Sequence, residues 1–91
     1  MTSFNQRSEE RAPVSKTIVY VIDSPIQDKP IDGFIEDISE SGFCMFTPYP
    51  LRKAEKIKIN TDTSLPSHRA VVRWSEQYDD EYCKVGLEFY Y

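Results

Sequence analysis

Six short segments rich in β-branched and aromatic residues follow one another along the chain, and turn-forming residues bound each of them. The clearest is the segment 55–60, where isoleucine alternates with lysine or asparagine, as in a strand with one wet face. No segment has the convincing periodicity of an amphipathic helix. The expected strands cover residues 16–22, 33–38, 43–47, 55–60, 70–74 and 82–90. This pattern predicts an all-β fold, either an antiparallel barrel or a sandwich.

The first thirteen residues differ from the rest because they are polar and charged, with Phe4 as the main apolar side chain. They end at Pro13, which biases Ala12 away from the helical region. We expect residues 1–13 to form a flexible N-terminal arm and residues 14–91 to form one β domain. At 91 residues, such a chain can fold alone but is too small for a deep cleft between domains. Function is therefore expected on the surface.

The charge balance excludes a general surface for long polyanions. The chain has 11 Lys and Arg against 15 Asp and Glu, a formal net charge of -4 at pH 7, so no DNA or RNA partner is expected. Cys44 and Cys83 are too few for a disulfide framework and lack metal-ligand spacing. Because no signal peptide or membrane-spanning run is visible, we expect a cytoplasmic protein without membrane insertion, metal or cofactor.

Two separated motifs carry groups suited to binding a guanine nucleotide. Arg7 and Arg11 stand four residues apart in the arm, and Asp37, Ser39 and Gly42 follow the second expected strand. An arginine fork matches the O6 and N7 acceptors of guanine and also binds phosphate through charge-assisted hydrogen bonds. A carboxylate accepts from N1–H and the amine on the opposite edge, and a hydroxyl adds a further contact. The glycine permits a positive φ or a close approach of ligand to backbone.

The spacing of these residues is compatible with one shared site. If Asp37 and Ser39 are both extended, their side chains point to the same face. Arg7 and Arg11 share one side of a helical turn, or a flexible arm wraps both of them around a ligand. We favour the wrapping arm, which predicts that ligand binding orders the arm against the β domain.

Both motifs resemble those of the PilZ domain family, bacterial six-stranded β-barrels that bind cyclic di-GMP. The Arg-x-x-x-Arg arm stands here as Arg7 and Arg11, and the Asp-x-Ser-x-x-Gly turn as Asp37, Ser39 and Gly42. The resemblance covers nearly the whole chain and implies a six-stranded antiparallel barrel of the split-barrel type. It also implies a cyclic di-GMP receptor or adaptor that signals to an unidentified protein partner in motility, surface polysaccharide or biofilm control.

Two further residues are candidates for the same ligand site. Trp74 either packs in the core or at the barrel rim, or stacks on a nucleotide base. Arg73 either contacts ligand or faces solvent, because the register of its strand is not fixed by the sequence. The only histidine, His68, lies in a polar loop and is expected at the surface.

Each motif also has a structural interpretation that needs no ligand. Glu9 and Glu10 can neutralise the arm arginines locally, and Asp, Ser and Gly are common in ordinary turns. The alternative function is therefore a protein–protein interaction module with the PilZ fold that does not depend on cyclic di-GMP. An enzyme is not expected, because the sequence has no nucleophile–histidine pair, metal-ligand cluster or phosphate-binding glycine loop.

Overall fold

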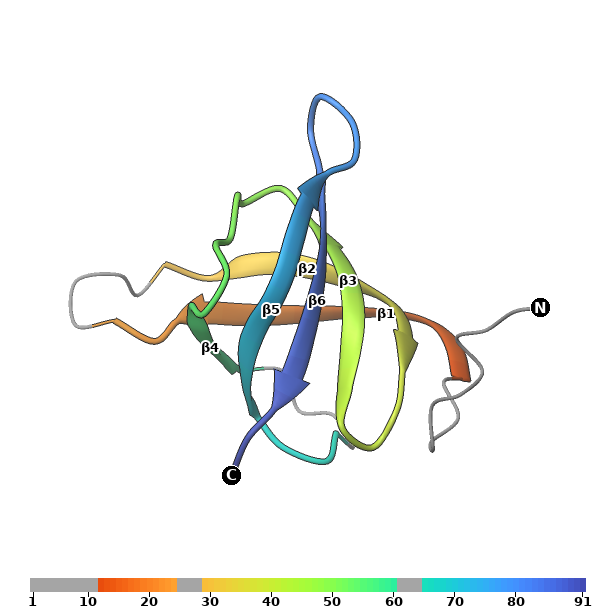
Figure 1. Cartoon of the computed structure of the whole chain (residues 1–91), viewed down its shortest axis with the longest axis vertical. Coiled ribbons are helices and arrows are strands. Elements are labelled where there is room, and N and C mark those ends of the chain that lie inside the picture. The colour runs from red at the N-terminus through yellow and green to blue at the C-terminus, as the bar shows by residue number, and fades with distance from the viewer. Residues whose placement is uncertain (1–11, 25–28, 61–64) are drawn as a thin grey trace.

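The computed structural model describes residues 12–24, 29–60 and 65–91, which form six strands (Figure 1). The six expected strands are all present. Among the described residues there is no helix of the length and hydrophobicity needed to cross a membrane. The strands are β1 (Ala12–Ile22), β2 (Ile31–Ile38), β3 (Gly42–Thr47), β4 (Lys56–Ile59), β5 (Arg69–Gln77) and β6 (Cys83–Phe89).

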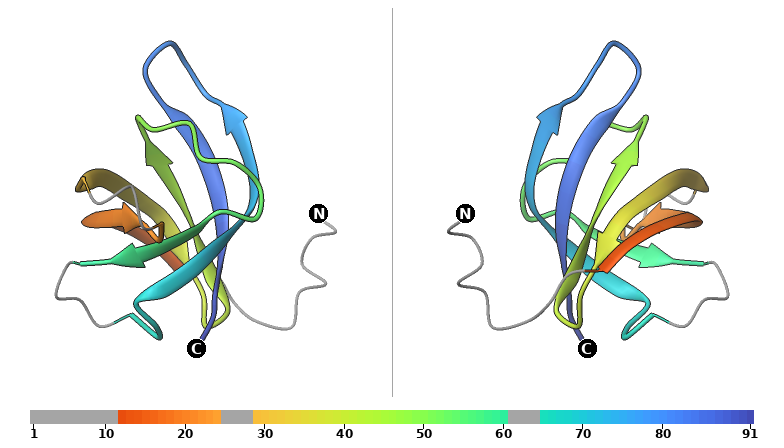
Figure 2. Two further views of the ribbon diagram at one scale, coloured as in Figure 1. Left: turned by 90° about the vertical axis from the view of Figure 1, so that its left-hand side faces the viewer. Right: turned by 90° about the vertical axis from the view of Figure 1, so that its right-hand side faces the viewer.

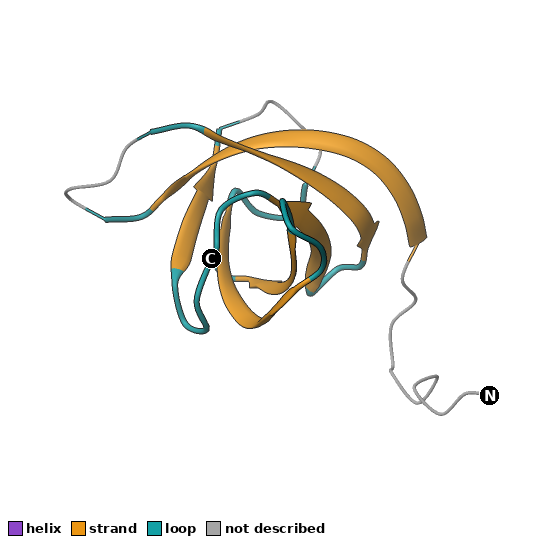
Figure 3. Ribbon diagram, turned by 90° about the horizontal axis from the view of Figure 1, so that it is seen from above, coloured by secondary structure: helices purple, strands orange, loops and turns teal. Residues whose placement is uncertain are grey.

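The strands close into an antiparallel barrel in the order β1-β2-β3-β6-β5-β4. The barrel is closed by pairing of β1 with β4, where Tyr20 is the register partner of Ile59. Seen from above in Figure 3, the strands surround a central space, and both views in Figure 2 show the β5–β6 hairpin rising beyond it. The prediction of an all-β barrel is confirmed, and the sandwich alternative is wrong.

The first strand begins earlier than the sequence pattern predicted. Ala12 pairs with Ile38 and Pro13 with Asp37, so β1 starts four residues before the expected Lys16. The register between β1 and β2 shifts between Pro13 and Lys16, so the start of β1 pairs with β2 in a different register from the rest of the strand. The expected arm otherwise lies outside the described residues.

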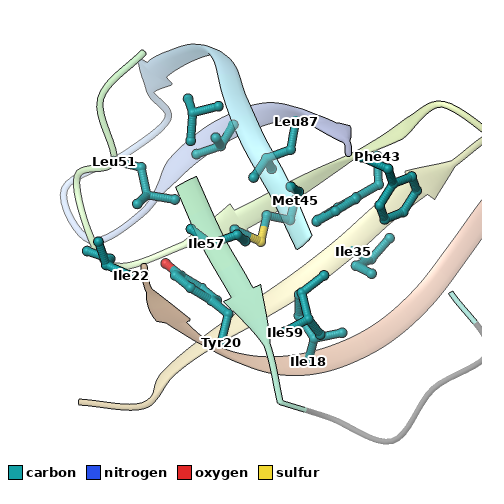
Figure 4. Packing of buried hydrophobic residues seen from close by; sticks show 14 of the residues in the cluster. Ile18, Tyr20, Ile22, Ile35, Phe43, Met45, Leu51, Ile57, Ile59 and Leu87 are labelled. Atoms are coloured by element: carbon teal, nitrogen blue, oxygen red, sulfur yellow. The ribbon is translucent and has the colours of Figure 1, made fainter. Parts of the chain in front are cut away.

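Alternation of side chains along the strands fills the inside of the barrel with apolar groups (Figure 4). In β4, for example, Ile57 and Ile59 are buried while Lys56 and Lys58 are exposed, as the sequence pattern predicted. The buried cluster consists of Ile18, Tyr20, Ile22, Ile35, Phe43, Met45, Leu51, Ile57, Ile59, Ala70, Val72, Cys83, Val85, Leu87 and Phe89.

One short chain of hydrogen bonds crosses this core. The Tyr20 hydroxyl lies 2.6 Å from Oγ1 of Thr47, which donates to the Asp32 carbonyl at 3.0 Å. A threonine hydroxyl has one hydrogen, so Tyr20 is the donor toward Thr47. Burial disfavours the charged phenolate and raises the pKa of Tyr20 to about 12.

Two further register shifts interrupt the ladders. One lies in β2 between Ile35 and Asp37, and the other in β5 between Val72 and Trp74. In each strand two residues advance against one on the neighbouring strand, as in a β-bulge, so two successive side chains turn toward the same face. β2 and β5 each carry one bulge, and these two strands lie on either side of the β3–β6 pair.

Candidate functional site

The two bulges lie at opposite ends of one row of residues on the outer face of the barrel. Asp37 of β2 is the register partner of Cys44 in β3, Cys44 is the partner of Gly86 in β6, and Gly86 is the partner of Trp74 in β5. We call Asp37, Cys44, Gly86 and Trp74 the bulged row. The row brings two sequence-predicted residues, Asp37 and Trp74, onto one face.

The turn after β2 is closed by its own hydrogen bonds. The Ser39 amide donates to the Gly42 carbonyl at 2.8 Å, and the Ser39 hydroxyl lies 3.4 Å from the same oxygen. Ser39 follows the last residue of β2 and is buried, whereas Asp37 is half-buried. The Ser39–Gly42 backbone bond continues the pairing of β2 with β3 beyond Ile38 and Phe43, and the Ser39 hydroxyl is directed at the turn.

Gly42 is required by the backbone of a neighbouring strand. Its φ is not positive, so the conformational alternative considered from the sequence is wrong. A Cβ added at Gly42 would lie 2.1 Å from the carbonyl oxygen of Leu87 in β6, far inside van der Waals contact. The close approach that makes glycine necessary is therefore that of β6.

The indole of Trp74 packs on the outer face beside Gly86 of β6. A Cβ added at Gly86 would lie 2.2 Å from Nε1 of the Trp74 indole, so only glycine leaves room for the ring there. The indole is 42 % exposed, which leaves part of it open to solvent. Burial of Trp74 in the core is therefore excluded, and its stacking on a nucleotide base stays a prediction.

Arg73 also points outward, because the bulge in β5 places it and Trp74 on the same side of the sheet. Its guanidinium forms an ion pair and a hydrogen bond with the Glu88 carboxylate of β6. Both side chains are about half exposed, which makes this a surface pair of modest strength. Glu88 is in turn the register partner of Gly42, so the pair lies beside the turn.

At the β2 end of the row, two carboxylates lie close to a thiol. Ligand atoms of Glu36, Asp37 and Cys44 all lie within 4.8 Å of one another. The Lys84 ammonium lies 3.2 Å from Glu36, and this hydrogen bond raises the pKa of Lys84. The Lys84 ammonium therefore already compensates the charge of Glu36, and we assign no metal ion to these three residues.

Arg7 and Arg11 lie outside the described residues, but the point where their segment enters the barrel is defined. Ala12, the residue after Arg11, is the register partner of Ile38, and Pro13 is the partner of Asp37. The sequence that carries both arginines therefore joins the barrel directly beside the Asp37 end of the bulged row.

Sequence reasoning did not assign Cys44, Gly86 or Glu88 to this surface. Gly86 carries a signal that was available, since an isolated glycine inside a strand often marks close approach of another group. Cys44 and Glu88 carry none, because their positions depend on register between strands that are distant in sequence.

A comparison with protein-family models matches residues 5–91 to the model described as PilZ domain. This match covers both motifs and all six strands. No curated protein matches the chain. PilZ domains are binding and adaptor domains that recognise cyclic di-GMP, and they are not an enzyme family.

Proposed function

Because this chain belongs to the PilZ domain family, we propose that it is a receptor for cyclic di-GMP that signals to a partner protein. The observation that carries the proposal is the pairing of Pro13 with Asp37. It attaches the segment with Arg7 and Arg11 beside the turn with Asp37, so groups from both motifs can reach one ligand. Five residues at about 3.5 Å each allow Arg7 a reach of roughly 18 Å from Ala12.

The two motifs have complementary roles in this proposal. Arg7 and Arg11 bind the O6 and N7 edge of guanine and the phosphates, because a planar guanidinium fork fits both groups. The Asp37 carboxylate accepts from N1–H and the amine of the base. Ser39 and Gly42 hold the turn in shape, as their hydrogen bonds and their contact with β6 support.

The other end of the bulged row provides a stacking surface. The exposed face of Trp74 offers a platform for a guanine base, a contact worth about 1 to 3 kcal/mol for a nucleobase on an aromatic ring. Arg73 adds a phosphate contact once it exchanges Glu88 for the ligand. Glu88 thus competes with the ligand for Arg73.

In this mechanism, the arm orders onto the barrel when the ligand binds, and a partner protein recognises the ordered arm. The ligand is a bacterial second messenger made in the cytoplasm, so we place the protein there. The alternative is an interaction module with the PilZ fold that works without cyclic di-GMP. An aromatic surface next to the bulged row, formed by Phe34, Phe46, Tyr78 and Tyr82, supports that alternative.

Isothermal calorimetry with cyclic di-GMP tests the proposal directly. We expect binding by the unaltered chain, a loss of about 100-fold or more in Arg7→Ala/Arg11→Ala, and a loss of about 10-fold or more in Asp37→Ala. The matched control is Arg52→Ala/Arg69→Ala, which removes the same charge from exposed positions outside the site.

No heat from the unaltered chain at micromolar concentrations would reject the receptor proposal and favour the interaction module. Binding that survives removal of Arg7 and Arg11 would place the ligand elsewhere. An equal loss in the control double variant would show that net charge, and not the motif, attracts the ligand.

A further inference from the structure

A second row of side chains crosses the outer face of the same four strands, two residues away from the bulged row on β3, β5 and β6 and three residues away on β2. Phe34 of β2 is the register partner of Phe46 in β3, Phe46 is the partner of Lys84 in β6, and Lys84 is the partner of Glu76 in β5. We call Phe34, Phe46, Lys84 and Glu76 the aromatic row. Two residues along a strand place the rows about 7 Å apart.

Two tyrosines of the β5–β6 hairpin extend the aromatic row. The ring of Tyr78 packs edge-on against Phe46 with centroids 4.7 Å apart, and Tyr82 packs against Phe34 at 6.1 Å. Phe34 is 41 % exposed and Tyr78 is 62 % exposed. Linked aromatic rings that remain open to solvent are the residue class enriched at protein interfaces.

The hairpin that carries these tyrosines is held in shape by its own hydrogen bonds. The Asp79 carboxylate accepts from the amides of Glu81 and Tyr82 at 2.8 and 2.7 Å, and the Tyr78 amide donates to the Tyr82 carbonyl at 3.0 Å. The hairpin projects beyond the barrel at the top of Figure 1. A partner would therefore meet a preformed surface, which lowers the entropic cost of binding.

The surface around the rings is strongly acidic. Four exposed carboxylate residues, Glu76, Asp79, Asp80 and Glu81, lie on or beside the hairpin. The nearby cation Lys84 lies 5.6 Å above the Phe46 ring and 3.2 Å from Glu36, which already balances its charge. The surface thus offers aromatic faces and negative charge together.

We propose that the aromatic row and the β5–β6 hairpin form a docking surface for a protein segment that carries arginine together with apolar side chains. A guanidinium stacks on aromatic faces and pairs with carboxylates, so one arginine uses both features of the surface. Lys84 over Phe46 shows that a ring of this row already holds a cation.

Charge argues against two other occupants. A second copy of this chain in a two-fold contact would bring the hairpin carboxylates of both copies together. The same carboxylates are repelled by anionic lipid headgroups. The proposal uses none of the ligand-binding residues named above and is tested without cyclic di-GMP, so its failure and that of the receptor proposal are distinguishable.

The test is an NMR titration of the ¹⁵N-labelled chain with a short synthetic peptide that alternates arginine and leucine. We expect chemical-shift changes concentrated in Phe34, Phe46 and residues 76–84. Asp80→Asn/Glu81→Gln and Tyr78→Ala should each weaken binding about five-fold or more, as expected for contacts at the centre of an interface. Well-dispersed spectra of both variants would show that they remain folded.

The matched control is Asp23→Asn/Glu40→Gln, which removes two exposed carboxylates away from the hairpin and should leave the affinity unchanged. A peptide with serine in place of leucine keeps the charge and should bind more weakly. The proposal is wrong if the shift changes spread over the acidic surface, if the control loses affinity equally, or if no shifts appear at millimolar peptide. It is also wrong if sedimentation shows a dimer that Tyr78→Ala dissociates.

Discussion

The bulged row and the aromatic row cross the same four strands as neighbours, yet they are built differently. In the bulged row, register shifts in β2 and β5 turn extra side chains outward, and Gly86 leaves room for an indole ring. In the aromatic row, pairing is continuous, and bulky side chains cover the sheet. Irregular backbone therefore places polar side chains and one indole outward in one row, while regular pairing presents aromatic rings in the other.

The largest expected effect distinguishes Gly42, at the turn after β2, from Gly86, in the bulged row. Gly42→Ala should lower the free energy of unfolding by about 3 kcal/mol or more, because the new Cβ meets the backbone of β6. Gly86→Ala should cost about 1 kcal/mol or less, because the exposed indole of Trp74 can turn away. Urea denaturation of both variants measures this difference, and equal losses would contradict the distinction.

Alkaline pH tests the burial of Tyr20 in the core beneath the two rows. Tyr20 has a folded pKa of about 12, above its unfolded value of 10.0, because burial disfavours the phenolate. Its contribution is complete below pH 10 and is lost as pH rises through 12, up to about 2 to 3 kcal/mol. The advantage of the unaltered chain over Tyr20→Phe in urea denaturation should shrink over this range. A constant difference between pH 9 and 12 would contradict the assignment.

One substitution in each row should separate the two proposed binding functions. Trp74→Ala should weaken cyclic di-GMP binding by about 10-fold, because it removes the stacking platform, and should leave binding of the arginine–leucine peptide unchanged. Tyr78→Ala should have the opposite pattern. Calorimetry with both ligands measures this, and one variant that weakens both would merge the two rows into one site.

The smallest expected effect concerns the ion pair between Arg73 and Glu88. Glu88→Gln should tighten cyclic di-GMP binding by roughly two- to five-fold, because it releases Arg73 from a surface pair of modest strength. The gain should shrink in 0.5 M salt, where exposed charges are screened. Weaker binding by this variant would instead identify Glu88 as a ligand contact.

Much of the fold could be predicted because local patterns determine it. Alternation in β4 and the prolines after β3 are both local, and the strands they define are present. The early start of β1 was missed because Ala12 and Pro13 pair with β2, a contact between segments more than twenty residues apart. Propensity near a proline does not report such pairing.

The candidate site was less predictable, and the bulges are the reason. The sequence around Glu36 and Arg73 gives no sign of an extra residue, so the face of Arg73 stayed open until the register was known. The need for Gly42 was predicted, but its cause, the carbonyl of Leu87, comes from β6. Motifs nominated the candidate residues, and long-range pairing determined where the described ones lie.

The contact between Trp74 and Gly86 has an optical consequence. The chain contains one tryptophan, and its indole lies half-exposed on the bulged row. Tryptophan emission therefore reports on this one position, without a label or a substitution. A base stacked on the ring would exclude water and quench that emission, whereas a peptide on the aromatic row would leave it largely unchanged. The fluorescence of Trp74 therefore distinguishes ligand binding at the bulged row from peptide binding at the aromatic row.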